Sequence, residues 1–239
     1  MDAVKPWFAP EKSANYVEGM QAYDRTNLGG SEFISGHIFY EEIKRLPYIS
    51  DYRLTSVFRD PYARLASHIR YMDRYNQSEY ETAFDHLGDE LKTVVKTIET
   101  VDFQRPADLE RLFASLPAWG RAAYDNCQTR FLVCDFESVV ASPYGDLPDG
   151  ALDLALERLE ALDVIGISEA LDTTIERLAV LLDAPSPARA PRSNTASSNR
   201  RLDHNDPRIR EVMKPLLGLD EPLYARAKAL FDQRVSVPA

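Results

Sequence analysis

The hydrophobic positions of this chain follow two different periods, and these periods predict alternating strands and helices. Short runs that alternate, or that are rich in β-branched residues, predict strands at 33–37, 53–58 and 162–165. Hydrophobic residues spaced three and four apart predict helices instead. The helical stretches lie at about 39–46, from Pro61 onward, 78–100, 109–116, the first part of 118–138, 152–159, 175–182 and 221–234.

The order of these elements favours an α/β fold in which a parallel sheet is flanked by helices. Residues 1–30 show no clear period, so we expect an irregular N-terminal segment. Turn-forming residues concentrate at 141–150 and 184–207, which predicts loops. No shift in composition marks a boundary, and we therefore expect a single domain over residues 1–239.

The second predicted strand runs into a helix through the sequence Arg59-Asp60-Pro61. Asp60 is a favourable N-cap, and Pro61 suits the first helical position, where no backbone donor is needed. Along this helix the hydrophobic residues face the core, whereas Arg64 and Ser67 fall on another face. Arg59 and Ser67 can therefore reach the same small volume, and a guanidinium beside a hydroxyl suits a phosphate group. The alternative is a capped turn with Arg59 in an ordinary surface ion pair.

His37 is the best candidate for a general base among the four histidines. It follows Gly36 at the end of a predicted strand, where α/β folds gather their ligands. An imidazole titrates near neutral pH and can accept a proton there. A structural or surface role for His37 is the alternative. His68, beside Ser67, is its main rival, either as a phosphate contact or as a packing residue.

Composition narrows the possible partners. The net charge of −10 argues against nucleic acid, because phosphate backbones are bound by basic surfaces. Two cysteines, Cys127 and Cys134, supply neither a disulfide framework nor a zinc site, and we expect no metal cofactor. The sequence contains no apolar run of membrane-spanning length and no signal-peptide core, which predicts a cytoplasmic protein without a membrane segment.

The segment Arg59-Asp-Pro-x-x-Arg-Leu-x-Ser67 resembles the 3′-phosphate-binding motif of sulfotransferases that use 3′-phosphoadenosine 5′-phosphosulfate (PAPS). The likeness is to the carbohydrate branch, which includes heparan sulfate 2-O-sulfotransferase and bacterial homologues. It implies a P-loop-NTPase-like sulfotransferase fold, PAPS as co-substrate and no metal. Arg59 and Ser67 are then the 3′-phosphate ligands. His37 matches the Gly-His element whose imidazole accepts the proton of the sugar hydroxyl.

Two further segments resemble the same family. Asn-x-Gln128-x-Arg130 is similar to a segment common in these enzymes. The resemblance implies that Gln128 or Arg130 lies near the acceptor pocket or braces it. The alternative is an exposed helix with ordinary polar groups. The basic, hydroxyl-rich loop within 184–207 matches a loop that closes over the nucleotide. Asn194, Ser197 and Arg200 are its candidate ligands. A solvated loop without a ligand is the alternative there.

One family element has no match. Sulfotransferases carry a glycine-rich loop with a lysine that binds the 5′-phosphosulfate, but neither Lys5 nor Lys12 has following glycines, and no lysine accompanies Gly29-Gly30. We expect either a start downstream of the original one, with the first β-loop-α unit lost, or a degenerate family member. The first hypothesis is therefore sulfuryl transfer from PAPS to a carbohydrate-type hydroxyl. The alternatives are an inactive or truncated member that binds 3′-phosphoadenosine 5′-phosphate (PAP) or a glycan, and a nucleotide kinase of related fold.

Overall fold

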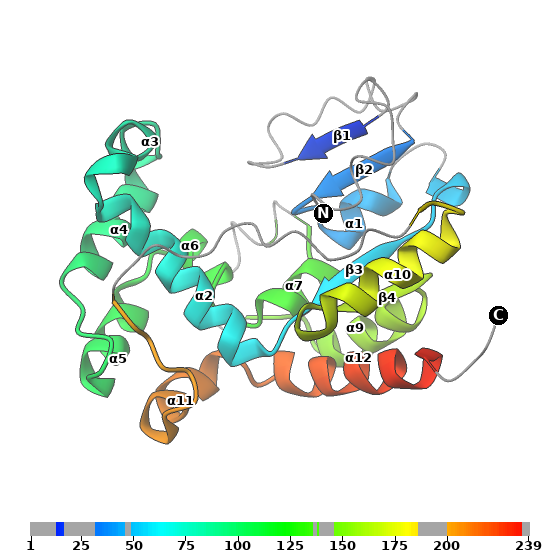
Figure 1. Cartoon of the computed structure of the whole chain (residues 1–239). Helices are drawn as coiled ribbons and strands as arrows, with labels where there is room; N and C mark the ends of the chain where they lie inside the picture. The colour runs from blue at the N-terminus through cyan, green and yellow to red at the C-terminus, as the bar shows by residue number, and fades with distance from the viewer. Residues whose placement is uncertain are drawn as a thin grey trace.

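A computed structural model describes residues 13–16, 32–45, 49–135, 138, 146–185 and 200–235. Within these ranges the chain is a mixed α/β structure in which short parallel strands lie among helices (Figure 1). This confirms the expected class of fold. No helix in the described ranges is both long enough and apolar enough to cross a membrane.

The described strands form two parallel pairs. β1 (Ser13–Tyr16) pairs with β2 (Phe33–Gly36), and β3 (Thr55–Phe58) pairs with β4 (Val164–Ile167), with Phe58 opposite Ile167 at the end of the second ladder. The last three strands lie close to their predicted places. β1 corrects the expectation that the whole of residues 1–30 is irregular.

Helices make up most of the remaining structure, with short 3-10 turns between some of them. They are α1 (Tyr40–Lys44), α2 (Pro61–Asp73), α3 (Glu81–Asp85), α4 (Asp89–Glu99), α5 (Pro106–Ser115), α6 (Ala118–Ala122), α7 (Cys127–Val133), α9 (Ala151–Glu160), α10 (Leu171–Leu181), α11 (Pro207–Met213) and α12 (Asp220–Val235). The helix predicted at 78–100 is interrupted before α4, where Gly88 is the N-cap residue. The sequence pattern did not predict α11, which begins at Pro207 with Asp206 as its N-cap.

Two hydrophobic cores are joined by α2. One core lies among α2, α4, α5 and α11, and the other lies among the β3–β4 pair, α7, α9 and α12. In Figure 1, α2 runs from the end of β3 toward the group formed by α3, α4 and α5. Leu65 and Ile69 of α2 are fully buried in the first core, as their spacing predicts. The opposite face of α2 therefore remains for polar residues.

Candidate functional site

The corner between β3 and α2 is held rigidly through its main chain. The Arg59 N–H donates to Oε1 of Gln128 at 2.9 Å, and the Arg59 carbonyl accepts from Nε2 of the same side chain at 3.0 Å. The Asp60 N–H donates to Oε1 of Glu169 at 3.0 Å, and the Asp60 carbonyl accepts from the Arg64 N–H at 2.8 Å. All four main-chain polar groups of these two residues therefore have partners, so the direction in which Arg59 leaves the strand is fixed.

The side chain of Asp60 also acts as the sequence predicts. Its Oδ1 accepts from the Ala63 N–H at 2.9 Å, and Pro61 occupies the first helical position. This cap satisfies one of the free N–H groups at the start of α2. The Asp60 carboxylate therefore binds an N–H group at the start of α2. It forms no ion pair with Arg59.

Three arginines gather at this corner without a carboxylate partner. The pKa of Arg59 is lowered, chiefly by burial, while Glu169 raises it and the nearby charges of Arg70 and Arg64 lower it further. None of the three forms an ion pair with any residue that the structure describes. Nine other described arginines do pair with a carboxylate: Arg45, Arg53, Arg111, Arg130, Arg158, Arg200, Arg201, Arg208 and Arg226. Acidic groups still act on this corner without forming ion pairs, because Glu169 and Asp60 raise the pKa of Arg59 and the charge of Arg64 acts on Asp220.

Only some of the hydrogen-bond donors of the Arg64 guanidinium have partners among the described residues. One of its terminal nitrogens, Nη2, donates to the Ala123 carbonyl at 2.5 Å, but its Nε is buried and has no hydrogen-bond partner among the residues that the structure describes. A buried donor on a charged group is costly to leave unpaired.

Ser67 lies on the face of α2 between Arg64 and Arg70, three residues from each. Its hydroxyl makes no hydrogen bond to another described residue. Arg64 and Arg70, which flank Ser67 along α2, are among the charges that act on Arg59, together with Glu169 and Asp60. That Arg59 and Ser67 bind one phosphate stays a prediction. Arg70 was not among the predicted ligands, although its position three residues after Ser67 could have suggested it.

His37 lies near one of these arginines, Arg64. It follows β2, keeps contact with solvent, and places its ring 6.0 Å from that of Phe131 on α7. Partial burial, and then the charge of Arg64, lower the pKa of His37 below its usual value of 6.5. An imidazole that is neutral at pH 7 can accept a proton, so the predicted base and the predicted phosphate corner share Arg64 as a neighbour.

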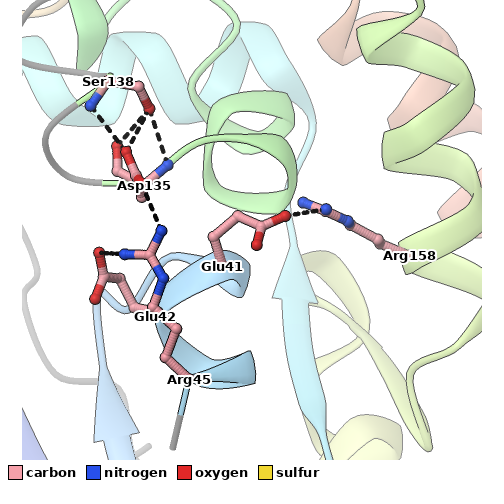
Figure 2. Close-up of polar contacts among 6 residues, drawn as sticks. All are labelled: Glu41, Glu42, Arg45, Asp135, Ser138 and Arg158. Carbon is pink, nitrogen blue, oxygen red and sulfur yellow. Dashed lines mark hydrogen bonds and ion pairs between the residues drawn. The ribbon is translucent and has the colours of Figure 1, made fainter.

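The helix that follows His37 is anchored at both of its ends. Figure 2 shows Glu41 of α1 paired with Arg158 of α9, and Arg45 paired with Asp135, which follows α7. The Arg45–Asp135 distance is 2.9 Å, and Asp135 in turn accepts hydrogen bonds from Ser138. Contacts from two elements therefore hold α1, and with it the segment that carries His37.

His68 is packed rather than open. Its ring meets the edge of Tyr124 at 5.0 Å between centroids, and burial, Arg64 and His37 together lower its pKa to about 3. The Tyr124 hydroxyl is buried and makes no hydrogen bond to any other described residue. His68 thus remains neutral at physiological pH and fits the packing role better than that of a cationic phosphate ligand.

Gln128 and Arg130 have partners inside the protein. Gln128 holds the main chain of Arg59, as described above. Arg130 is 2% exposed and pairs with Asp125, whose carbonyl also accepts from the Arg130 Nε at 2.9 Å. These contacts are to Arg59 and Asp125, so the predicted place of Gln128 or Arg130 at the acceptor pocket, or bracing it, stays a prediction. The sequence did not indicate that Gln128 contacts Arg59.

Arg200 lies apart from this corner. It pairs with Asp73 at 2.5 Å, donates to the carbonyls of Ile98 and Val101, and covers the ring of Phe103. These contacts connect the chain before α11 to α2 and α4. The other two candidates of the covering loop, Asn194 and Ser197, lie outside the described residues.

No protein-family model, curated protein or solved structure matches this chain. The part of the chain that the structure describes contains no cluster of histidine, cysteine, aspartate and glutamate suited to a metal ion. The geometry at the β3–α2 corner is therefore the basis for a functional proposal.

Proposed function

We propose that this chain is a PAPS-dependent sulfotransferase with a P-loop-NTPase-like fold, and that its β3–α2 corner binds the 3′-phosphate of the nucleotide. The observation that carries the proposal is the group of Arg59, Arg64 and Arg70 without ion-pair partners among the described residues. A phosphate there would receive charge-assisted hydrogen bonds from the guanidiniums and one from the Ser67 hydroxyl.

His37 is the proposed general base. PAPS supplies a sulfuryl group with PAP as the leaving group. The neutral imidazole takes the proton of an acceptor hydroxyl as that oxygen bonds to sulfur and the bond between sulfur and the PAP oxygen breaks. The lowered pKa of His37 keeps the imidazole free of a proton at pH 7. The acceptor class, a carbohydrate-type hydroxyl, follows from the resemblance of the sequence motifs.

A non-catalytic PAP-binding or glycan-binding protein is the second candidate. The sequence after β1, residues 17–31, contains three glycines, two of them adjacent, and one arginine but no lysine. In phosphoryl and sulfuryl transfer, a lysine at the phosphate loop offsets the charge that develops on the leaving oxygen. Its absence from that segment favours binding without turnover.

Calorimetric titration of the full chain with PAP and with adenosine 5′-monophosphate separates these possibilities. The proposal predicts that PAP binds more tightly, because only PAP carries the 3′-phosphate. Release of PAP from PAPS, measured with a panel of monosaccharides and oligosaccharides, then tests catalysis. Release of PAP that depends on an acceptor supports the sulfotransferase. PAP binding without release supports the non-catalytic PAP-binding protein. If the chain binds PAP no more tightly than the monophosphate, neither protein binds the nucleotide as proposed.

A further inference from the structure

The side chain of Gln128 continues the pattern of a β-ladder past its last strand pair. The β3–β4 ladder ends at Phe58 and Ile167, and the next residue, Arg59, has no strand partner in the described structure. The Gln128 amide takes that place, because it accepts from the Arg59 N–H at 2.9 Å and donates to the Arg59 carbonyl at 3.0 Å. A primary amide can do both at once, as a peptide group does.

Gln128 is itself held from a third element. Its N–H donates to Oδ2 of Asp220 at 3.2 Å, and Thr129 donates to Oδ1 of Asp220 through its N–H and its hydroxyl, both at 2.8 Å. In return, Oδ1 of Asn126 accepts from the N–H groups of Leu219 and Asp220. The starts of α7 and α12 thus cap each other, and Gln128 transmits this fixed position to Arg59.

The two hydrogen bonds between the Gln128 amide and the Arg59 main chain, called the clamp below, add no charge beside the Arg59 guanidinium. A carboxylate in the place of Gln128 would attract the guanidinium and neutralise it, whereas an amide holds the backbone without adding charge. The Arg59 guanidinium forms no ion pair with another described residue. The amide therefore fixes the main chain without an ion pair to the guanidinium, and the carboxylate that acts most strongly on Arg59 is that of Glu169, which holds the Asp60 N–H.

We infer that Gln128 is a positioning residue that orients Arg59 toward the 3′-phosphate, an inference that rests on the proposed function. It assigns the Asn-x-Gln-x-Arg segment to the nucleotide side of the site rather than to the acceptor. Gln128 touches neither substrate in this account; it acts through Arg59.

A double-mutant cycle tests the inference. Gln128→Met removes both hydrogen bonds at similar size, and Gln104→Met is the matched control, because Gln104 is an exposed glutamine between α4 and α5. Calorimetry with PAP and adenosine 5′-monophosphate should show PAP affinity reduced about tenfold in Gln128→Met and the monophosphate affinity nearly unchanged. In an Arg59→Ala background, Gln128→Met should reduce PAP affinity no further.

Each outcome has a distinct meaning. Equal losses for both nucleotides, or a full additional loss in the Arg59→Ala background, would overturn the inference and leave the proposed function standing. A wild-type chain that does not prefer PAP would overturn both. If Gln128→Met does not fold, Gln128→Asn provides the same test: it keeps the amide and adds no charge, but its side chain is one methylene shorter, so it should weaken the hydrogen bonds to Arg59 and lower PAP affinity by up to about tenfold.

Discussion

The positive charge of the Arg64 guanidinium lowers the pKa of the His37 imidazole, although the two residues belong to different supersecondary units. Arg64 lies on α2 beside the β3–α2 corner, whereas His37 lies between β2 and α1. The charge of Arg64 adds to the effect of burial and lowers the pKa of His37. The same cation that is available for an anion therefore also keeps the proposed base neutral.

Replacing His37 by alanine should remove turnover while leaving nucleotide binding intact. A general base contributes roughly 10²–10⁴-fold to rate, so PAP release from PAPS should fall by about that factor with the best acceptor of the panel. The calorimetric affinity for PAP should not change, because His37 does not contact the 3′-phosphate in this account. His86→Ala is the control, since His86 is an exposed histidine that follows α3. Full activity of the His37→Ala variant would refute the base assignment.

Acid should destabilise the fold through His68. Its pKa is about 3 in the native state and near 6.5 when unfolded, so unfolding takes up a proton between these values. The free energy of unfolding should therefore decrease as pH falls from about 6.5 toward 3. His37, whose pKa is also lowered, acts in the same direction, and Asp220, whose pKa burial raises, acts in the opposite one.

Comparison with His68→Phe isolates this contribution. Phenylalanine keeps a ring against Tyr124 but cannot bind a proton. Urea denaturation of both proteins between pH 4 and pH 7 should show a weaker dependence on pH in the variant. Identical slopes would contradict the assignment of His68 as a buried neutral imidazole.

Asn126 should contribute to stability in two separable ways. Its backbone is in the left-handed region, with φ of 42°, and its side chain caps α12. Asn126→Gly removes the cap but suits the backbone, whereas Asn126→Ala loses both. Urea denaturation should show Asn126→Ala less stable than Asn126→Gly by about 1 kcal/mol, and both less stable than wild type by about 1 kcal/mol or more. Equal stability of the two variants would show that the backbone conformation carries no cost.

Gly166 in β4 should not accept a side chain. A Cβ at this position would lie 2.5 Å from Cγ2 of Thr174 and 3.0 Å from Cγ2 of Val57. Thr174 cannot move freely, because its hydroxyl accepts from the Ile167 N–H at 3.1 Å. Gly166→Ala should therefore lower the free energy of unfolding by about 1–3 kcal/mol, measured by urea denaturation. Gly218→Ala, at an exposed turn position with open space around it, is the control and should change stability little.

The sequence predicts the parts of the site that depend on neighbours along the chain. The Asp60 cap, the Pro61 start and the face of α2 that carries Arg64 and Ser67 all follow from local rules, and the structure contains them. The clamp between Gln128 and Arg59 joins residues 69 positions apart, so no local pattern could reveal it. The same holds for the arrangement that makes Arg64 a neighbour of both His37 and His68.

Charged residues show a second limit of local reasoning. Arg130 and Arg200 look like solvent-exposed cations in the sequence, but one is buried with Asp125 and the other joins Asp73 to the α4 end. Arg59 and Arg70 are the same residue type, yet they have no ion-pair partner among the described residues. Burial and pairing depend on the tertiary fold, and only the structure separates these two groups of arginines.

Phosphorus NMR of PAP tests the central claim most directly, because the 3′-phosphate and the 5′-phosphate give separate resonances. The account predicts that the 3′ resonance shifts when PAP binds the wild-type chain, and that Arg59→Gln removes this shift and weakens binding about 10- to 150-fold. Arg53→Gln, at an exposed arginine paired with Asp163, should leave the shift in place. An unshifted 3′ resonance in the wild type, or an equal shift in Arg59→Gln, would contradict the claim that Arg59 binds the 3′-phosphate.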